Sequence, residues 1–185
     1  MWAKPKNIVT IKVRKNSTET EEKKYFYSYK TDKCRLLFQV EKKDKDTFRV
    51  VERLENQPNL YRDFPLIGSE KFHFPFYLDG FKFNPLETRN GLYLNGELNE
   101  EAIENRNIIS HAIDSSIKFT DWLLDNLDKR YLLAKTQIPE PPQIYDDIAI
   151  KWFIEQQKKW RKALIELRLL KDSGGDNIEL KYLKL

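Results

Sequence analysis

One arginine, Arg89, stands in a segment whose composition predicts a tightly held turn. It belongs to Leu86-Glu-Thr-Arg-Asn-Gly91, which directly follows Asn84-Pro85. Pro, Asn and Gly favour turns, and a guanidinium held by a turn is suited to bidentate contact with a phosphate or a carboxylate. The alternative interpretation is a structural salt bridge, for example to Glu87 or Glu70.

Two short motifs have the form of nucleotide-binding signatures but lack their context. Glu101-Ala-Ile-Glu-Asn105 matches the E-x-x-x-N pattern that places a magnesium-binding Asn on an ATPase helix, and Asp172-Ser-Gly-Gly175 partly matches an adenine-binding glycine loop. The glycine spacing is wrong, however, and neither a glycine-rich phosphate lid nor a G-x-x-x-x-G-K-[ST] loop occurs. We therefore expect no nucleotide site built by this chain alone.

Other reactive side chains are few. Cys34 is the only cysteine, which excludes an internal disulfide, and the two histidines, His73 and His111, stand far apart in the sequence. A zinc site is not expected from such a set. No Ser, His and Asp arrangement indicates a hydrolase.

A tryptophan-rich segment combines aromatic and cationic residues. Trp152, Phe153 and Trp160 alternate with lysines and an arginine, a set that can stack bases and neutralise phosphates. The aromatic residues fit the buried stripe of a helix better, so we expect them in the core and the lysines on the solvated face.

Alternating apolar and polar residues predict the strands that carry these features. Four strands are expected in the first third of the chain, joined as an antiparallel meander with one covered face, and two shorter strands follow the meander. The expected ranges are 8–13, 25–29, 34–40 and 47–52, then 74–78 and 92–94.

Two helices are expected in the second half. The first is capped by Asn99 and runs to about Leu127, with its apolar residues at a spacing of three and four. Pro-rich residues 138–142 form a stiff linker, and a second helix covers about 146–170 before a strand-like tail. The fold class is α+β: a mostly antiparallel sheet packed by a helix makes up residues 1–135. Residues 136–185 form a helical C-terminal extension, either separate or part of the same domain.

Bulk properties indicate a folded chain with a solvated, mixed-charge surface. The net charge of the 185 residues is +4, and lysines and arginines alternate with acidic residues almost everywhere, so nucleic acid is not an expected partner. No apolar run is long enough to span a bilayer, and no signal-peptide core is present at the N-terminus. We expect a cytoplasmic protein without membrane contact.

The turn-rich segment resembles one found in a known family. Asp63-Phe-Pro-Leu-Ile-Gly-Ser-Glu70, the run from Phe74 to Pro85, and Glu87-Thr-Arg-Asn-Gly91 resemble the segment that follows the ATP-binding domain in sacsin-like proteins. These proteins are GHKL ATPases, like the ninety-kilodalton heat-shock chaperones, gyrase and MutL. The resemblance covers residues 60–125 and is fainter over 139–185.

The resemblance implies a middle, or transducer, domain with a chaperone-like role. In that family an arginine of the middle domain reaches the γ-phosphate of ATP held by the preceding domain, and Arg89 matches it by position. The resemblance further implies that Thr88 and Asn90 frame Arg89, that Asn84 and Glu87 hold the turn, and that Arg106 is a weaker candidate for the same role.

The ATP-binding domain itself is missing from this sequence. The resemblance therefore implies a larger parent protein that binds ATP and magnesium, whereas this chain alone binds no cofactor and hydrolyses no ATP. A strand that ends at the last residue also suggests that the chain continues. The expected partners are the ATP-binding domain of the same parent and a client protein.

The rival hypothesis is a non-enzymatic module that binds protein or single-stranded nucleic acid. It would use the aromatic strand residues Tyr25, Tyr27 and Tyr29, or the Trp-Lys helix. The two hypotheses differ in what they expose. A transducer domain hides these aromatic side chains in a core and leaves Arg89 on an open rim, whereas a binding module exposes them within a basic stripe.

Overall fold

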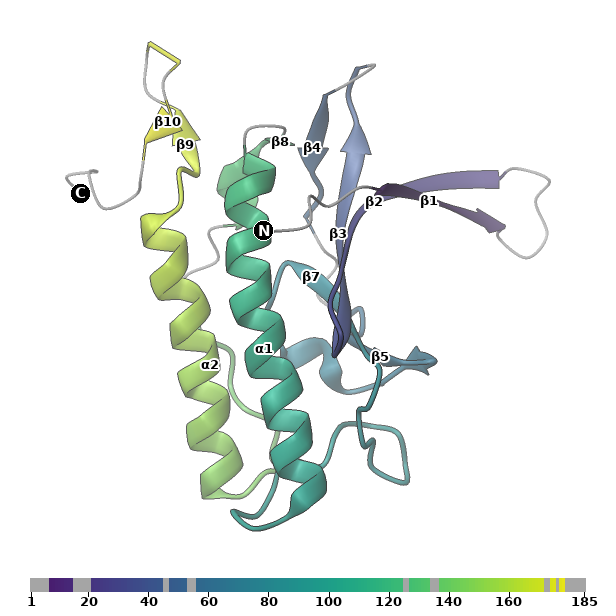
Figure 1. The fold of residues 1–185 in the computed structure, drawn as a ribbon, viewed down its shortest axis with the longest axis vertical. Coiled ribbons are helices and arrows are strands. Elements are labelled where there is room, and N and C mark those ends of the chain that lie inside the picture. Colours follow the sequence, from purple (N-terminus) through teal and green to yellow (C-terminus); the bar gives the residue numbers. More distant parts are fainter. Residues whose placement is uncertain are drawn as a thin grey trace.

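A computed structural model of the chain describes residues 7–14, 21–44, 47–52, 56–124, 127–133, 137–171, 174–175 and 177–178. These residues form an eight-stranded, mostly antiparallel sheet with two long helices on one side of it (Figure 1). The predicted α+β class is thereby confirmed.

The predicted antiparallel meander is present. Each strand pairs with the next one along the chain, although the fourth is short and contacts only the last residues of the third. The strands are β1 (Asn7–Arg14), β2 (Glu21–Lys30), β3 (Cys34–Lys42) and β4 (Phe48–Val50).

A strand from the turn-rich segment occupies the rest of the β3 edge. Strand β7 (Phe76–Gly80) pairs antiparallel with the first five residues of β3. On its far side lies β5 (Leu60–Arg62), which is parallel to β7, and then β6 (Phe64–Pro65). The parallel strand β8 (Leu127–Asp128) extends the sheet beyond β4. The predicted strand at 92–94 is reduced to one bridge between Pro85 and Leu92.

Both helices begin close to their predicted starts, and the predicted cap at Asn99 is present. In α1 (Glu100–Leu123), the side chain of Asn99 accepts a hydrogen bond from the Ala102 amide, and in α2 (Asp147–Glu166), Asp146 does the same for Ala149. Short 3-10 segments lie at Ser69–Lys71 and Arg130–Leu133. Neither α1 nor α2, as described, has the length and apolar character needed to cross a membrane.

Both helices end earlier than predicted. Helix α1 stops at Leu123 rather than near Leu127, because Leu127 joins the sheet in β8. Helix α2 stops at Glu166, because Leu167 takes an extended conformation and alternate residues, Leu167 and Leu169, enter the core. Strand β9 (Leu170–Lys171) then pairs with β10 (Asn177–Ile178), and the rest of the predicted C-terminal strand lies outside the described residues.

The two helices run parallel, side by side (Figure 1). Ser110 donates a hydrogen bond to Gln156 at 3.1 Å, and further along both helices Lys159 pairs with Asp114 at 2.7 Å. From α2, Phe153 contacts Phe72 edge-on. Trp160, also from α2 and only 1% exposed, packs on Phe76 of the sheet. The prediction that the aromatic side chains of this helix belong to the core is confirmed for Phe153 and Trp160, whereas Trp152 is only partly buried against the core.

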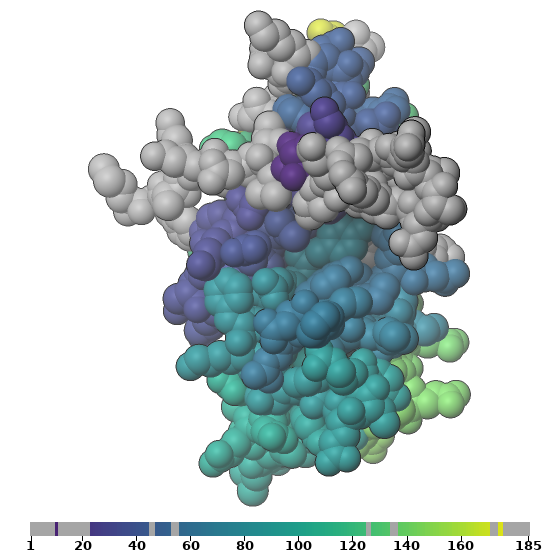
Figure 2. All heavy atoms as spheres, turned by 90° about the vertical axis from the view of Figure 1, so that its right-hand side faces the viewer, coloured from purple at the N-terminus to yellow at the C-terminus, as the bar shows by residue number. Residues whose placement is uncertain are grey.

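Successive side chains of the strands point to opposite faces of the sheet. The helix-covered face receives Tyr27, whose ring packs on Phe48, and Tyr29, whose ring stacks on Phe119 of α1. The other face, which Figure 2 presents to the viewer, carries Phe26 and Tyr77.

Candidate functional site

Arg89 lies at the tip of a closed loop. The Arg89 amide donates to the Leu86 carbonyl at 2.8 Å, and the Leu86 amide donates to the Gly91 carbonyl at 3.1 Å. Arg89 has a left-handed backbone with φ of 53°, which is uncommon for a residue other than glycine. Beside it, the Thr88 hydroxyl donates to the Asn90 side-chain oxygen at 2.6 Å. The side chains of Thr88 and Asn90 are thus hydrogen-bonded to each other on either side of Arg89.

The Arg89 guanidinium rests on the β5–β6 hairpin. Its Nη2 donates to the Arg62 carbonyl at 3.1 Å, and its central carbon lies 5.8 Å from the centre of the Phe64 ring. Over the described ranges, no carboxylate forms an ion pair with Arg89, so the alternative of a salt bridge to Glu87 or Glu70 is wrong. The side chain is exposed, and its Nε and Nη1 groups have no acceptor among those residues.

Asn105, a fully buried residue of α1, holds the base of this loop. Its side-chain oxygen accepts from the Asn84 amide, and its NH₂ group donates to the carbonyls of Asn84 and Tyr93, all at 2.8 Å. The Asn84 side chain also donates to Glu104 at 2.9 Å. Sequence reasoning considered Asn105 only as part of a rejected ATPase pattern; an Asn on the apolar face of a helix was the signal for its structural role.

Gly68 supports the loop from the other side. Its φ is +95°, and a Cβ placed on it would lie 2.2 Å from the Asn90 carbonyl oxygen. Next to it, the Ser69 hydroxyl accepts hydrogen bonds from the amides of Asn59 and Leu60, both at 3.0 Å. The turn after β6 is thereby tied both to β5 and to the loop of Arg89.

Arg106 is engaged within the fold. Its Nη1 donates to the Leu94 carbonyl at 2.6 Å and its Nη2 to the Gly96 carbonyl at 3.0 Å. The Gly96 amide in turn donates to Asp146, the cap of α2, at 2.8 Å. Hydrogen bonds from the amides of Ala149 and Gly96 lower the pKa of Asp146. Arg106 therefore ties the segment that precedes α1 to α1 itself and, through Gly96, to the start of α2.

Two large apolar side chains are exposed near the loop of Arg89: Phe64, which lies under the guanidinium, and Ile67, which precedes the Gly68 that meets Asn90. Phe64 is 67% exposed and Ile67 is 68% exposed. We call Phe64, Ile67 and Arg89 the Arg89 patch. In Figure 2 the blue segment that contains β5 and β6 adjoins the teal segment below it. The loop of Arg89 belongs to that teal part of the chain, in agreement with the approach of Gly68 to Asn90.

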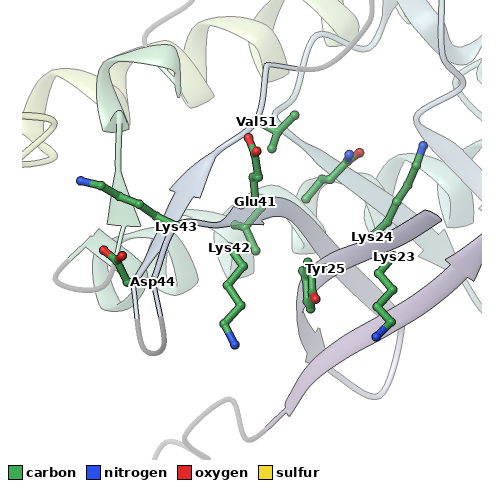
Figure 3. Close-up of a pocket in the computed structure, with 10 residues that line it drawn as sticks. Lys23, Lys24, Tyr25, Glu41, Lys42, Lys43, Asp44 and Val51 are labelled. Atoms are coloured by element: carbon green, nitrogen blue, oxygen red, sulfur yellow. The ribbon is translucent and has the colours of Figure 1, made fainter. Parts of the chain in front are cut away.

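Among the residues that the structure describes, two hollows on the sheet could hold a ligand. The first, of about 590 Å³, is lined by Lys23, Lys24, Lys42 and Lys43 where β2 separates from β3 (Figure 3). Its lysines do not converge, because Lys23 and Lys42 point to one side of the sheet and Lys24 to the other. Lys43 is already paired with Asp128 at 3.1 Å.

The second hollow, of about 490 Å³, lies on the face without helices and is lined by Tyr61, Tyr77 and Asp79 among others. Across the described ranges, no three His, Cys, Asp or Glu side chains are grouped to hold a metal ion.

Comparison of the chain with protein-family models, with curated proteins and with solved structures found no match.

Proposed function

We propose that this chain is a middle, or transducer, domain of a sacsin-like GHKL ATPase. In this proposal Arg89 contacts the terminal phosphate of ATP held by a separate ATP-binding domain, and the contact couples nucleotide state to domain movement. ATP and magnesium belong to that other domain, and this chain alone hydrolyses nothing.

The observation that carries the proposal is the state of the Arg89 guanidinium. It is exposed, has no carboxylate partner over the described ranges, and keeps Nε and Nη1 available while Nη2 is anchored on the Arg62 carbonyl. A guanidinium supplied to a phosphoryl group acts by stabilising its charge, and fixing the guanidinium beforehand lowers the entropy cost of that contact. Phe64 and Ile67 supply apolar area for docking around the cation.

The alternative of a binding module has a narrower basis. Tyr25, Tyr27 and Tyr29 are half-buried on the helix side, and Trp160 is buried, so the surface for base stacking is small. The Arg89 patch favours a protein partner over a nucleic acid, because it combines two exposed apolar side chains with a single cation.

The test is ATP hydrolysis by the parent protein, with this chain joined to its ATP-binding domain. We expect Arg89→Ala to lower kcat by about 10³-fold or more, in the range known for supplied arginines, with little change in nucleotide Kd. Arg89→Lys should recover only part of the rate, because an ammonium lacks the planar fork of donors.

Arg49→Ala is the matched control. Arg49 is a half-exposed arginine of β4, paired with Glu41, and lies on another part of the sheet. Wild-type turnover in Arg89→Ala would show that the proposal is wrong. Equal losses in Arg89→Ala and Arg49→Ala would indicate a general charge effect and would also contradict it.

A further inference from the structure

The second hollow lies on the open face of the sheet, apart from the loop of Arg89. Its floor and walls come from four strands and from the residues that flank β5. The residues that matter for recognition are Phe26, Leu37, Tyr61, Asp63, Tyr77 and Asp79. Its volume of about 490 Å³ is within the range of small-ligand pockets and exceeds what a single small ion needs.

The aromatic part of the hollow is held rigidly. Tyr77 contacts Phe26 and Tyr61 edge-on, each with ring centres 6.0 Å apart. The Tyr77 hydroxyl lies 2.8 Å from the side-chain oxygen of Gln57 and 3.0 Å from that of Gln39. These contacts fix the Tyr77 ring before any ligand arrives, which lowers the entropy cost of binding.

Two carboxylates lie at one end of the hollow. Asp79 is half-buried, and over the described ranges it has neither an ion pair nor a hydrogen-bond donor. Arg35 lies opposite Asp79 on β3, and its charge interacts with the Asp79 carboxylate electrostatically, without an ion pair between them. Burial raises the pKa of Asp79, Arg35 partly offsets this increase, and Asp63 adds to it. Asp63 has a left-handed backbone, with φ of 60°.

The opposite end of the hollow carries the opposite charge. Lys24 lies beyond Tyr25, which pairs with Val40 near the end of β3, whereas Asp79 lies opposite Arg35 near the start of β3. Lys24 is therefore several residues away from Asp79 along the strands. A cation entering at the Asp79 end meets two carboxylates and aromatic rings without displacing a described partner.

We propose that this hollow binds a guanidinium group carried on an alkyl stem, as in an arginine side chain. The planar cation would pair with Asp79 and Asp63, stack against the aromatic wall, and lay its stem along Leu37 and Phe26. Guanidinium suits such a site better than ammonium, because it is less strongly hydrated, stacks on rings and offers parallel donors to carboxylates. This inference is independent of the function proposed for Arg89.

The experiment is an NMR titration of the full chain with two probes at low salt and pH 7. N-acetyl-arginine amide tests a free guanidinium, and the capped peptide Gly-Gly-Arg-Gly-Gly tests an arginine within a polypeptide. We expect saturable shifts of the backbone amides of Leu37, Tyr77 and Asp79 with both probes. Tighter binding of the peptide would show that the ligand is an arginine within a polypeptide. Equal binding of the two probes would show that the ligand is a free guanidinium compound.

Charge dependence is tested by changes on both sides of the contact. Asp79→Asn and Asp63→Asn keep the shape of the side chain and should each weaken binding by about tenfold or more. N-acetyl-citrulline amide, a neutral isostere of the arginine probe, should not bind. Asp44→Asn removes a carboxylate of the lysine-lined hollow and is the matched control.

Several outcomes would overturn the inference. They are an absence of shifts at these amides with both probes, equal binding of the citrulline probe, and unchanged affinity in Asp79→Asn. The amide spectrum of each variant shows whether it is folded. Arg89→Ala should bind the probes as wild type does, so failure here is distinguishable from failure of the proposed transducer function.

Discussion

The carbonyl oxygen of Asn90 occupies the place that a side chain on Gly68 would need, since a Cβ on Gly68 would come within 2.2 Å of it. The turn after β6 and the loop of Arg89 therefore touch through their backbones. The position of the Arg89 guanidinium over Phe64 depends on this contact between residues 22 positions apart.

Gly68→Ala should displace the loop and destabilise the fold. A left-handed backbone costs an alanine about 1 kcal/mol, and the clash with Asn90 adds to that cost, so we expect the free energy of unfolding to fall by more than about 2 kcal/mol. Urea denaturation measures the change. Gly175→Ala is the matched control, because Gly175 has a similar φ of +92° and nothing within 4 Å of the added Cβ. Equal losses in the two variants would rule out the contact as the cause.

Asn105→Ala should release the loop of Arg89 from α1. The substitution removes three hydrogen bonds and leaves the partly buried Asn84 amide and Tyr93 carbonyl without these partners, whereas the Asn84 carbonyl keeps the Tyr93 amide. We expect a cost of about 2–4 kcal/mol. Hydrogen exchange of the Asn84 amide should become faster. The control is Asn107→Ala, an exposed position on the same helix, which should change stability by less than about 0.5 kcal/mol. Unchanged exchange at Asn84 would contradict this role of Asn105.

Tyr145 should make the fold sensitive to alkali. Burial raises the pKa of its phenol to about 12, with a smaller opposing effect of the Leu92 backbone. The folded state therefore retains the proton longer than the unfolded state, whose phenol titrates near the ordinary value of 10. The contribution of Tyr145 to stability is constant below about pH 10 and falls as the pH rises from 10 to 12. The full loss is about 2.7 kcal/mol for a shift of two units.

Unfolding free energies of wild type and Tyr145→Phe between pH 8 and 11 measure this effect. The variant should lose less stability than wild type as the pH rises above 10. Tyr131→Phe, at a residue that is 54% exposed, controls for removal of a phenol hydroxyl and should retain the wild-type slope. Parallel curves for wild type and Tyr145→Phe would exclude Tyr145 as the source.

Asp79→Asn should stabilise the unliganded protein at neutral pH. The pKa of Asp79 is raised mainly by burial, so its ionised form is disfavoured in the folded state. Wild-type stability therefore falls as the pH rises through the folded pKa, and the penalty is absent below the ordinary value of 3.8. Melting temperatures should show the variant above wild type at pH 7 and the gap closing toward pH 3.5. A gap independent of pH would indicate a packing effect instead.

Much of the fold was predictable because it depends on neighbours in the sequence. The first three strands and their hairpin connections follow from alternating residues and polar turns. The caps at Asn99 and Asp146 follow from short side chains that bond an amide three residues later. The turn around Arg89 follows from Pro85 and Gly91. In each case the stabilising contact spans only a few residues, so the local sequence is sufficient.

Other features were decided by contacts between distant segments. Strand β7 pairs with the β3 edge that a simple meander would leave to β4, because Leu36 of β3 and Leu78 of β7 meet in the core. Strand β5 then pairs with β7 in a parallel direction. Leu127 and Leu170 leave their predicted helices to join strands. Strand propensity and helical spacing overlap for such leucines, and only the available partners select between them.

The features of the candidate site also divide into those that the local sequence predicts and those that tertiary contacts decide. The sequence around Arg89 was sufficient to indicate a turn with a cation at its tip, since Pro, Asn and Gly restrict their own backbone. It did not indicate that Arg62 and Phe64 would hold the guanidinium, that Asn105 would clamp the loop, or that Asp79 and Tyr61 would line one open hollow. The residues joined in this way lie between 12 and 27 positions apart, and burial and hydrogen bonding across such distances exist only once the chain has folded.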